Sequence, residues 1–237
     1  MSPRILVVEH QASCPPALFG EWLEEAGAEL DVCRPWAGDA LPALASYDGL
    51  LVLGGEMGAD DDATVPWLAP LKELVREAAG TGLPTLGICL GHQLVAVALG
   101  GEVRRNPLGQ SVGVLATGWT AERAADPLTG GLTGTRGIHW NNDVVTRVPD
   151  GTVVLAASAA GEVQVARFAS AAWGVQLHPE ADGRVVQAWA ESDRADHLER
   201  GLDQEAVLAE VDTARAELDA AWRPLAHRFA ALAGERR

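Results

Sequence analysis

The 237-residue chain has little cysteine, a single lysine and no long hydrophobic run. Its three cysteines, Cys14, Cys33 and Cys89, are odd in number and form no CxxC pair, which argues against a disulfide framework or a zinc site. The first segment holds only four consecutive apolar residues, 5–8, too few for a signal-peptide core or a membrane span. We therefore predict a cytoplasmic protein without a metal site, a cofactor or a membrane anchor.

Positive charge is also scarce. Lysine and arginine together number 18 against 33 aspartates and glutamates, so the formal net charge is −15. A nucleic-acid surface needs a basic patch to neutralise phosphates, and none is visible in this sequence. We therefore exclude nucleic acid as a partner. The chain is 48% hydrophobic, which is enough to bury a full core.

Short apolar runs alternate with helical patterns in the first hundred residues. Each run has the look of a buried parallel strand, followed by a turn rich in glycine or proline and then by a helix. The predicted strands are 5–8, 50–53 and 84–88, and the predicted helices are 16–26, 66–79 and 90–99. This alternation predicts a three-layer α/β domain with a largely parallel sheet.

The rest of the chain has a different pattern. Between residues 101 and 176 we predict short strands at 112–116, 153–156, 162–168 and 173–177. Residues 203–233 have helical periodicity, and Pro224 should kink this helix or start a second one. The helix either covers the sheet of its own domain or docks a partner. Without a dividing linker, we expect one domain, 1–237, with a core over about 1–190 and a helical extension over about 191–237.

One segment has the pattern of a nucleophile turn. Residues 87–91 read Gly-Ile-Cys-Leu-Gly, at the junction of a predicted strand and a predicted helix. In such an elbow the glycines let strand and helix pass closely, and a strained turn exposes the nucleophile. The helix N-terminus would also stabilise negative charge on Cys89. Taken alone, the motif leaves open an ordinary buried thiol.

A second segment supplies a base for that thiol. Residues 173–180 read Trp-Gly-Val-Gln-Leu-His-Pro-Glu, so that an apolar strand ends at His178 and Glu180 follows two residues later. A thiol nucleophile needs a base within reach, and the base needs a group that fixes its tautomer. His178 by itself reads as a surface or capping histidine. Together, Cys89, His178 and Glu180 supply every role of a catalytic triad.

These segments resemble the signature blocks of class I (triad-type) glutamine amidotransferases. The blocks are 87–93 (Gly-Ile-Cys-Leu-Gly-His-Gln), 174–180 (Gly-Val-Gln-Leu-His-Pro-Glu) and the strand end Leu51-Val-Leu-Gly-Gly55. Their order and spacing match over residues 1–190, and the chain looks most like stand-alone, GMP-synthase-like amidotransferases with a C-terminal helical tail. The resemblance implies a three-layer, flavodoxin-like α/β fold with a mostly parallel central sheet and a C-terminal helical extension.

The resemblance also implies roles for five residues. Cys89 would attack the γ-carboxamide of glutamine, while His178 takes the thiol proton and passes one to the leaving ammonia. Glu180 would orient His178, and water would then hydrolyse the γ-glutamyl thioester. The backbone N–H groups of Gly55 and Leu90 would hold the oxyanion, where each preorganised donor contributes on the order of 10²–10³ in rate.

Four further residues are expected to bind the substrate. Gln93 stands where the family contacts bound glutamine. Asn141, Asn142 and Asp143 occupy a segment that often reads Ser-His-Gly-Asp in relatives and touches the amino-acid end of the substrate.

The chain departs from the family pattern near this binding segment. Asn141 and Asn142 replace the histidine and the glycine, and Asn142 tolerates the left-handed backbone that glycine would supply. Glu56 stands where many relatives have proline, and Ser111 where related chains often carry glutamate. None of these changes touches the triad. They leave open whether glutamine or another γ-glutamyl compound is the substrate.

No unit that would consume ammonia can be recognised in the sequence. A Walker motif is excluded because the only lysine lies in Leu71-Lys72-Glu73, and no SGGxDS-like pyrophosphatase loop is present. Three functions stay open. The chain is an amidotransferase that supplies ammonia to a separate ammonia-accepting synthetase, a stand-alone γ-glutamyl hydrolase or peptidase, or a non-catalytic binding module that keeps the fold.

Overall fold

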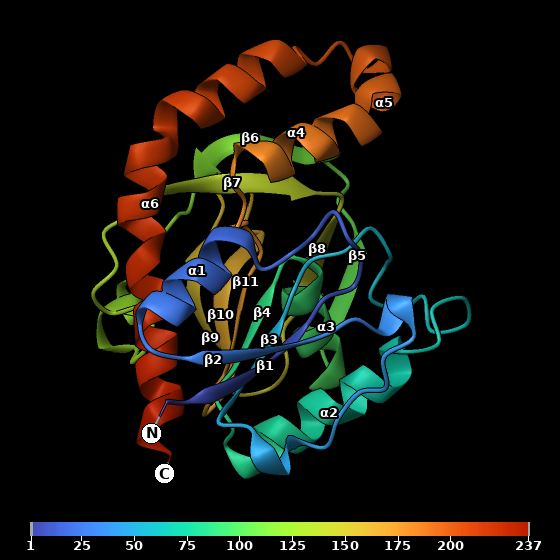
Figure 1. The fold of residues 1–237 in the computed structure, drawn as a ribbon. Helices are drawn as coiled ribbons and strands as arrows, with labels where there is room; N and C mark the ends of the chain where they lie inside the picture. Colours follow the sequence, from blue (N-terminus) through green and yellow to red (C-terminus); the bar gives the residue numbers. More distant parts are fainter. Residues whose placement is uncertain (1, 237) are drawn as a thin grey trace.

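The computed structural model describes residues 2–236, in which a central seven-stranded sheet lies between layers of helices (Figure 1). The strands are β1 (Arg4–Val8), β2 (Glu29–Cys33), β3 (Gly49–Val52), β4 (Thr85–Ile88), β5 (Glu102–Arg105), β6 (Ser111–Ala116), β7 (Arg136–Asn141), β8 (Asp143–Arg147), β9 (Val153–Ala157), β10 (Val163–Ala169) and β11 (Ala172–Val175). The helices are α1 (Ala17–Glu25), α2 (Leu68–Thr81), α3 (Leu90–Ala98), α4 (Gly183–Ser192), α5 (Arg194–Glu199) and α6 (Gln204–Glu235), with 3₁₀ turns at Pro35–Ala37, Leu44–Ser46 and Ala121–Ala125.

The central sheet has the strand order β2-β1-β3-β4-β11-β10-β9. The first five of these strands are parallel to one another, and β10 pairs antiparallel with both β11 and β9 at one side. The prediction of a mostly parallel α/β sheet is therefore confirmed. Strands β3, β4 and β11 are adjacent, so the segments that follow them meet at the carboxyl edge of the sheet, where ligands bind in open α/β folds.

Alternating side chains of the strands fill two separate cores. On β1, Ile5 and Val7 face the core shared with α1 and α6, whereas Leu6 and Val8 face the core shared with α2 and α3. A strand buried on both faces must be apolar at every position, which explains the unbroken apolar runs in the sequence. The two cores give the predicted three layers.

The C-terminal helix α6 covers the sheet, as the first of the two sequence interpretations predicts. Its buried residues include Trp222, Leu225 and Phe229, which belong to the same core as α1. Pro224 lies inside this one helix, so the prediction that it starts a second helix is wrong. Trp222 and Leu225 on either side of Pro224 are fully buried, and their packing holds the turn in spite of its missing N–H group.

Several elements were not predicted. Strands β2, β5 and β8 are partly exposed, β7 carries buried polar residues between its apolar ones, and α4 and α5 are short. Three of these strands take part in small antiparallel pairs, β5 with β8 and β6 with β7. The pairs bring the segments around residues 105, 110 and 140–143 beside the carboxyl edge of the main sheet.

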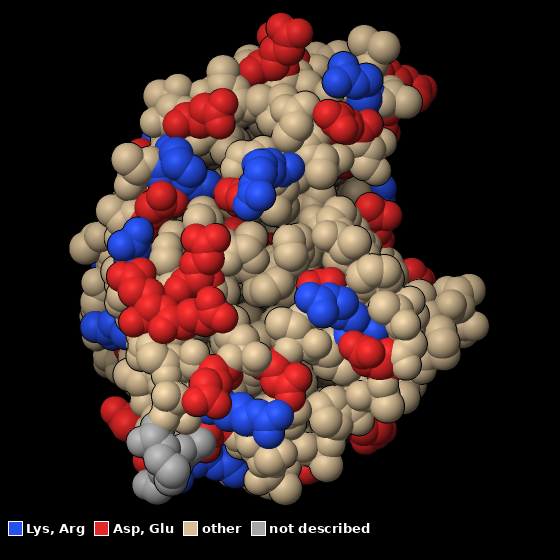
Figure 2. All heavy atoms as spheres, in the orientation of Figure 1, with Lys and Arg blue, Asp and Glu red and all other residues tan. Residues whose placement is uncertain are grey.

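Acidic side chains dominate part of the surface. Figure 2 shows them gathered over α1, where Glu21, Glu24 and Glu25 are exposed. In the acidic run at 60–62, Asp61 accepts a hydrogen bond from the Gly58 N–H and Asp62 pairs with Lys72 at 2.7 Å.

Over residues 2–236, no helix combines the length and the apolar character needed to cross a membrane.

Candidate active site

Cys89 lies in a strained turn between β4 and α3. Its backbone has φ 52° and ψ −107°, a left-handed φ that costs free energy for any residue except glycine. The neighbouring glycines explain how the turn closes. A Cβ atom at Gly87 would lie 2.2 Å from the Gly91 carbonyl oxygen, and one at Gly91 would lie 2.0 Å from the Val52 carbonyl oxygen. Only glycine fits at either position.

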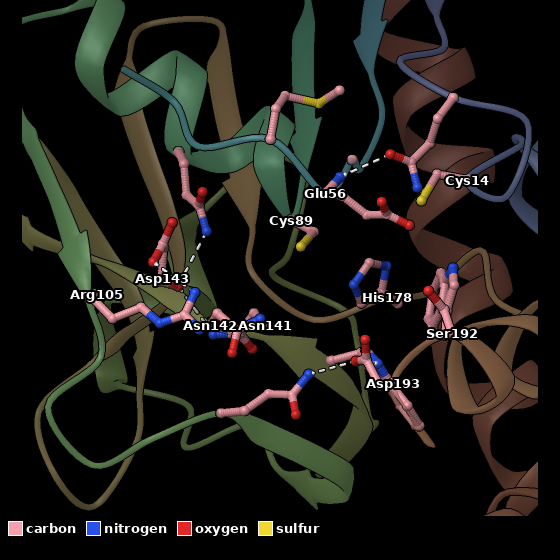
Figure 3. Close-up of a pocket in the computed structure, with 17 residues that line it drawn as sticks. Cys14, Glu56, Cys89, Arg105, Asn141, Asn142, Asp143, His178, Ser192 and Asp193 are labelled. Carbon is pink, nitrogen blue, oxygen red and sulfur yellow. Dashed lines mark hydrogen bonds and ion pairs between the residues drawn. The ribbon is translucent and has the colours of Figure 1, made fainter. Parts of the chain in front are cut away.

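His178 lies beside Cys89 (Figure 3) and forms a buried pair with Glu180. The His178 Nδ1 lies 2.7 Å from Glu180 Oε1, and the side chains are 3% and 1% exposed. Within residues 2–236, Nε2 of His178 has no hydrogen-bond partner. Burial lowers the pKa of His178, but the negative charges of a Cys89 thiolate and of Glu180 outweigh burial and raise this pKa well above its usual value. His178 is therefore suited to take up a proton beside the Cys89 sulfur.

The candidate oxyanion residues, Gly55 and Leu90, are neighbours. A Cβ atom at Gly55 would lie only 2.9 Å from Leu90 Cδ2 and 2.5 Å from Met57 Sδ, so position 55 has no room for a side chain. Leu90 is the first residue of α3, where backbone N–H groups have no acceptor within the helix. In residues 2–236, neither the Gly55 nor the Leu90 N–H donates to another backbone group. Both donors are thus free for an anion.

A chain of buried amides joins Cys89 to the predicted substrate segment. Gln176 donates from Nε2 to Cys89 Sγ at 3.6 Å and accepts at Oε1 from Gln93 Nε2 at 3.2 Å. Gln93 Nε2 also donates to the Asp143 carbonyl oxygen at 3.1 Å. The chain orients Gln93 at the wall of the cavity. Gln176 itself was not predicted, although it stands inside the block 174–180.

The segment 141–143 lines the cavity on the side of Gln93. Asn141 donates to the Asp143 carbonyl oxygen at 3.1 Å, while its own Oδ1 is buried and has no partner in the described chain. Arg105 lies 3.8 Å from the Asp143 carboxylate. Burial raises the pKa of Asp143, and Arg105 opposes this shift. Within residues 2–236, positive φ outside glycine occurs only at Ala17 and Cys89, so Asn142 does not use the left-handed conformation that we considered for it.

Helix α4 and its C-terminal end form the opposite wall. The Trp189 ring lies 4.5 Å from the His178 ring between centroids, and Trp140 lies 6.0 Å from Trp189. Ser192 and Asp193 line the same cavity. Trp189, Ser192 and Asp193 belong to no motif, and only the folded chain brings α4 over His178.

Cys14 also lines the cavity. Burial, followed by the neighbouring charges of Glu180 and a Cys89 thiolate, raises the pKa of Cys14. Cys14 therefore stays a neutral thiol, and Cys89 is the better nucleophile.

The residues predicted for the site meet at one cavity of about 300 Å³. Cys89, His178, Gly55, Gln93 and the segment 141–143 line it, whereas Glu180 and Leu90 are buried and not part of its lining. This volume is at the small end of the roughly 300–1,000 Å³ range of small-molecule sites, so it suits an amino acid or a slightly larger compound. Among residues 2–236, no group of three or more His, Cys, Asp or Glu side chains is placed to hold a metal ion.

The chain is similar to several known proteins. Residues 20–189 match the family model described as glutamine amidotransferase class-I. The chain is 32% identical over 182 residues to one component of the glutamine-hydrolysing GMP synthase of Saccharolobus solfataricus, covering 75% of this chain and 82% of that protein. It is 33% identical over 147 residues to a γ-glutamyl-L-1-hydroxyisopropylamide hydrolase of a Pseudomonas species, covering 59% of this chain and 49% of that protein.

The fold has close structural relatives too. A glutamine amidotransferase from Thermotoga maritima superposes with a TM-score of 0.86 over 97% of this chain and 99% of its own, at 24% identity. The family model covers well over half of the sequence, and the three-layer fold agrees with it. The chain therefore belongs to the class I glutamine amidotransferase family.

Proposed function

We propose that this protein hydrolyses the γ-amide of glutamine through a thioester on Cys89 and releases ammonia. The observation that carries the proposal is the strained Cys89 turn beside the buried His178–Glu180 pair. A triad-type nucleophile needs a base whose tautomer is fixed, and the 2.7 Å contact with Glu180 keeps the proton of neutral His178 on Nδ1. Nε2 is then free to accept the thiol proton.

The first half of the reaction forms the thioester. The Cys89 sulfur attacks the γ-carbonyl carbon, and the N–H groups of Gly55 and Leu90 stabilise the oxyanion that develops. His178 Nε2 gives the proton it holds to the nitrogen of the tetrahedral intermediate. The carbon–nitrogen bond then breaks, and ammonia leaves.

The second half regenerates the enzyme. Water attacks the thioester carbonyl as His178 Nε2 takes one of its protons. The carbon–sulfur bond breaks, glutamate forms, and the thiolate of Cys89 returns. Glu180 holds the imidazole in place through both halves. Gln93, Asn141, Asn142 and Asp143 bind the amino-acid end of the substrate, and the unpartnered Oδ1 of Asn141 supports this role because it can accept from an α-ammonium group.

The ammonia is used by a separate acceptor synthetase in this proposal. The similarity to the GMP synthase component of Saccharolobus solfataricus supports it, since that relative is named as one subunit of a glutamine-hydrolysing synthase. A second candidate is the hydrolysis of a larger γ-glutamyl amide. It is favoured by the additional cavity wall around Trp189 and Asp193 and by the similarity to a γ-glutamyl-hydroxyisopropylamide hydrolase.

Release of glutamate and ammonia from glutamine tests the proposal. We expect turnover by the wild-type protein and a loss of at least about 10⁴-fold in Cys89→Ala, since the covalent step is removed. Cys33→Ala is the matched control: this thiol is also buried, but its Sγ donates to the Ala40 carbonyl oxygen away from the cavity. Turnover that survives in Cys89→Ala would overturn the proposal.

A further inference from the structure

The cavity has two sides, separated by Cys89 (Figure 3). On one side lie Gln93, Asp143 and Arg105. On the other side lies His178, with Ser192 and Asp193 behind it. The first set offers groups for both charges of an amino-acid end, because the Arg105–Asp143 pair at 3.8 Å presents one cation and one anion.

Proton transfer from His178 indicates that the leaving group binds on the side of the cavity where His178 lies. In the proposed function His178 delivers a proton to the departing nitrogen, so that nitrogen must lie next to His178. Everything attached to it then extends toward Trp189 and Asp193. Glutamine carries no further atoms on this nitrogen, and its hydrolysis makes no use of that wall.

The wall holds Asp193 in a fixed position. Asp193 Oδ2 accepts hydrogen bonds from Trp140 Nε1 and Gln110 Nε2, both at 2.9 Å. The rings of Trp140 and Trp189 line the path from Asp193 to His178. A carboxylate with aromatic neighbours is the arrangement that proteins use to bind an ammonium group.

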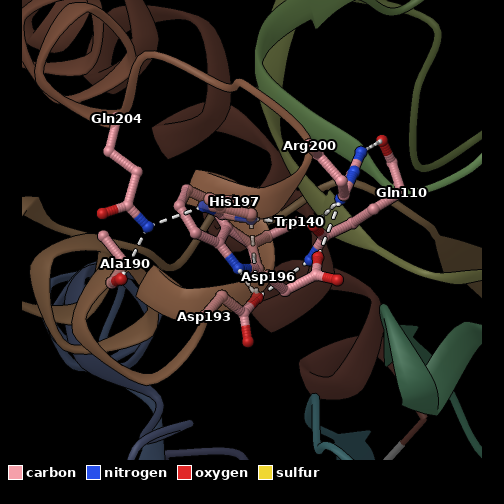
Figure 4. A network of polar contacts seen from close by, with 8 residues as sticks. All are labelled: Gln110, Trp140, Ala190, Asp193, Asp196, His197, Arg200 and Gln204. Atoms are coloured by element: carbon pink, nitrogen blue, oxygen red, sulfur yellow. Dashed lines mark hydrogen bonds and ion pairs between the residues drawn. The ribbon is translucent and has the colours of Figure 1, made fainter.

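Further hydrogen bonds behind the wall fix Gln110 (Figure 4). Gln110 Oε1 accepts from His197 Nε2 at 2.8 Å and from Arg200 at 2.7 Å, and Gln204 donates to His197 Nδ1 at 2.7 Å. Every one of these polar side chains has a partner, so the network orients Gln110, and Gln110 orients Asp193. Asp193 is thus prepositioned.

The charge on this side is negative. Of the described residues that line the cavity, Arg105 is the one lysine or arginine, and it lies on the opposite side with Asp143. Glu56 also lines the cavity. Behind the wall, burial lowers the pKa of His197, and Arg200 pairs with Asp196 at 3.2 Å. Neutral His197 leaves the charge of Asp193 in place.

We propose that Trp140, Trp189 and Asp193 form a binding site for the amine part of a γ-glutamyl amide, and that the site selects an amine with a second, positively charged nitrogen. The inference rests on the proposed function, because it takes Cys89 as the nucleophile. It names the substrate as a γ-glutamyl derivative of a diamine. Amines that end in a carboxylate are disfavoured by repulsion from Asp193 and Glu56.

Three γ-glutamyl amides with the same four-carbon leaving chain test the charge preference. The chain ends in an ammonium group in the 4-aminobutylamide, in a methyl group in the butylamide and in a carboxylate in the 4-aminobutyrate amide. We expect kcat/KM of the ammonium compound to exceed that of the methyl compound about tenfold or more, and the carboxylate compound to be cleaved at least tenfold more slowly than the methyl compound. A charged hydrogen bond in a partly buried site is strong enough for such ratios.

Asp193→Asn tests the residue. It keeps the side-chain shape and an acceptor oxygen for Trp140 but removes the charge, so the ratio of ammonium to methyl compound should fall about tenfold. Glu199→Gln removes a charge from α5 outside the cavity and away from this network, and it should keep the wild-type ratio. Equal cleavage of the three amides, or the same ratio in Asp193→Asn as in the wild type, would overturn the inference.

Glutamine, assayed alongside, separates this inference from the proposed function. If glutamine is hydrolysed in a Cys89-dependent way but the ammonium compound is not preferred, the inference fails and the proposed function stands. If neither glutamine nor any of the amides is cleaved, both fail.

Discussion

The two walls of the cavity are held by different means. At the carboxyl edge of the sheet, Cys89 stands between Gly87 and Gly91, whose backbone contacts are so close that no Cβ fits at either glycine. At the helical wall, Asp193, Gln110 and His197 are fixed by side-chain hydrogen bonds. A backbone contact depends on the fold itself, whereas a side-chain network depends on which residues are present. The reacting groups are thus tied to the fold, and the leaving-group side can change without disturbing them.

The largest expected effects on activity come from substitutions at two residues of the same loop, His178 and Glu180. His178→Ala removes the base and should lower kcat on the order of 10⁵-fold, whereas Glu180→Gln should cost at least tenfold less. An amide at position 180 can donate to Nδ1 and so stabilise the wrong tautomer of His178 in part of the population. Steady-state kinetics with glutamine measures both. Equal losses would mean that Glu180 does more than orient His178.

Two glycine-to-alanine substitutions compare the tight strand–helix contact at the sheet edge with an open helix position, through their effects on the free energy of unfolding. Gly91→Ala places a Cβ 2.0 Å from the Val52 carbonyl oxygen, so β3 and α3 must move apart, and we expect a loss of about 3–5 kcal/mol in the free energy of unfolding. Gly80→Ala, in α2, meets no atom within 4 Å and should gain up to about 1 kcal/mol from helix propensity. Urea denaturation measures both changes. A tolerated Gly91→Ala would show that the strand–helix contact can relax.

The smallest expected effect is a change in how stability depends on pH. Burial lowers the pKa of His92 to about 4. Between about pH 6.5 and pH 4, His92 is therefore protonated in the unfolded chain and neutral in the folded protein. Stability therefore falls between about pH 6.5 and pH 4, by about 1.4 kcal/mol per pH unit for this one residue.

Two variants test how much of this pH dependence comes from each wall, with His92 in α3 on the side of the sheet edge and His197 behind the helical wall. His92→Leu should flatten the profile of unfolding free energy by that slope. His197→Leu, behind the helical wall, should flatten it over a narrower range that starts at the same pH, because Asp193 partly opposes the lowering of the His197 pKa by burial. Urea unfolding at several pH values gives the slopes, and a His92→Leu profile parallel to that of the wild type would contradict the assignment.

The sequence predicts the sheet edge better than the helical wall. The runs at 5–8, 50–53 and 84–88 are apolar because both faces of their strands are buried, and each appears in the sheet as a strand. Local geometry also fixes the nucleophile turn, because Gly87 and Gly91 leave a signal at a constant spacing. These positions can be recognised before any tertiary structure is known.

The helical wall left no such signal. Trp189, Ser192 and Asp193 come together with Gln110 and Trp140 only through the packing of α4 onto the β6–β7 pair. Strand β7 was missed because the buried Gly137, His139 and Asn141 interrupt its apolar pattern, and Pro224 does not start a second helix because burial on both sides outweighs its helix-breaking effect. Long-range packing, rather than local propensity, decided each of these cases.

The turn that holds Cys89 has a consequence for synthesis of the chain. Its geometry depends on the bond from the Cys89 N–H to the Val175 carbonyl oxygen and on the bond from the Gly91 N–H to the Leu53 carbonyl oxygen. Leu53 is synthesised before Cys89, whereas Val175 is synthesised long after it. His178, which would activate the sulfur, follows Val175. A nascent chain that has just exposed its cysteine therefore holds an ordinary thiol, and its reactivity begins only when the last strand of the sheet is in place.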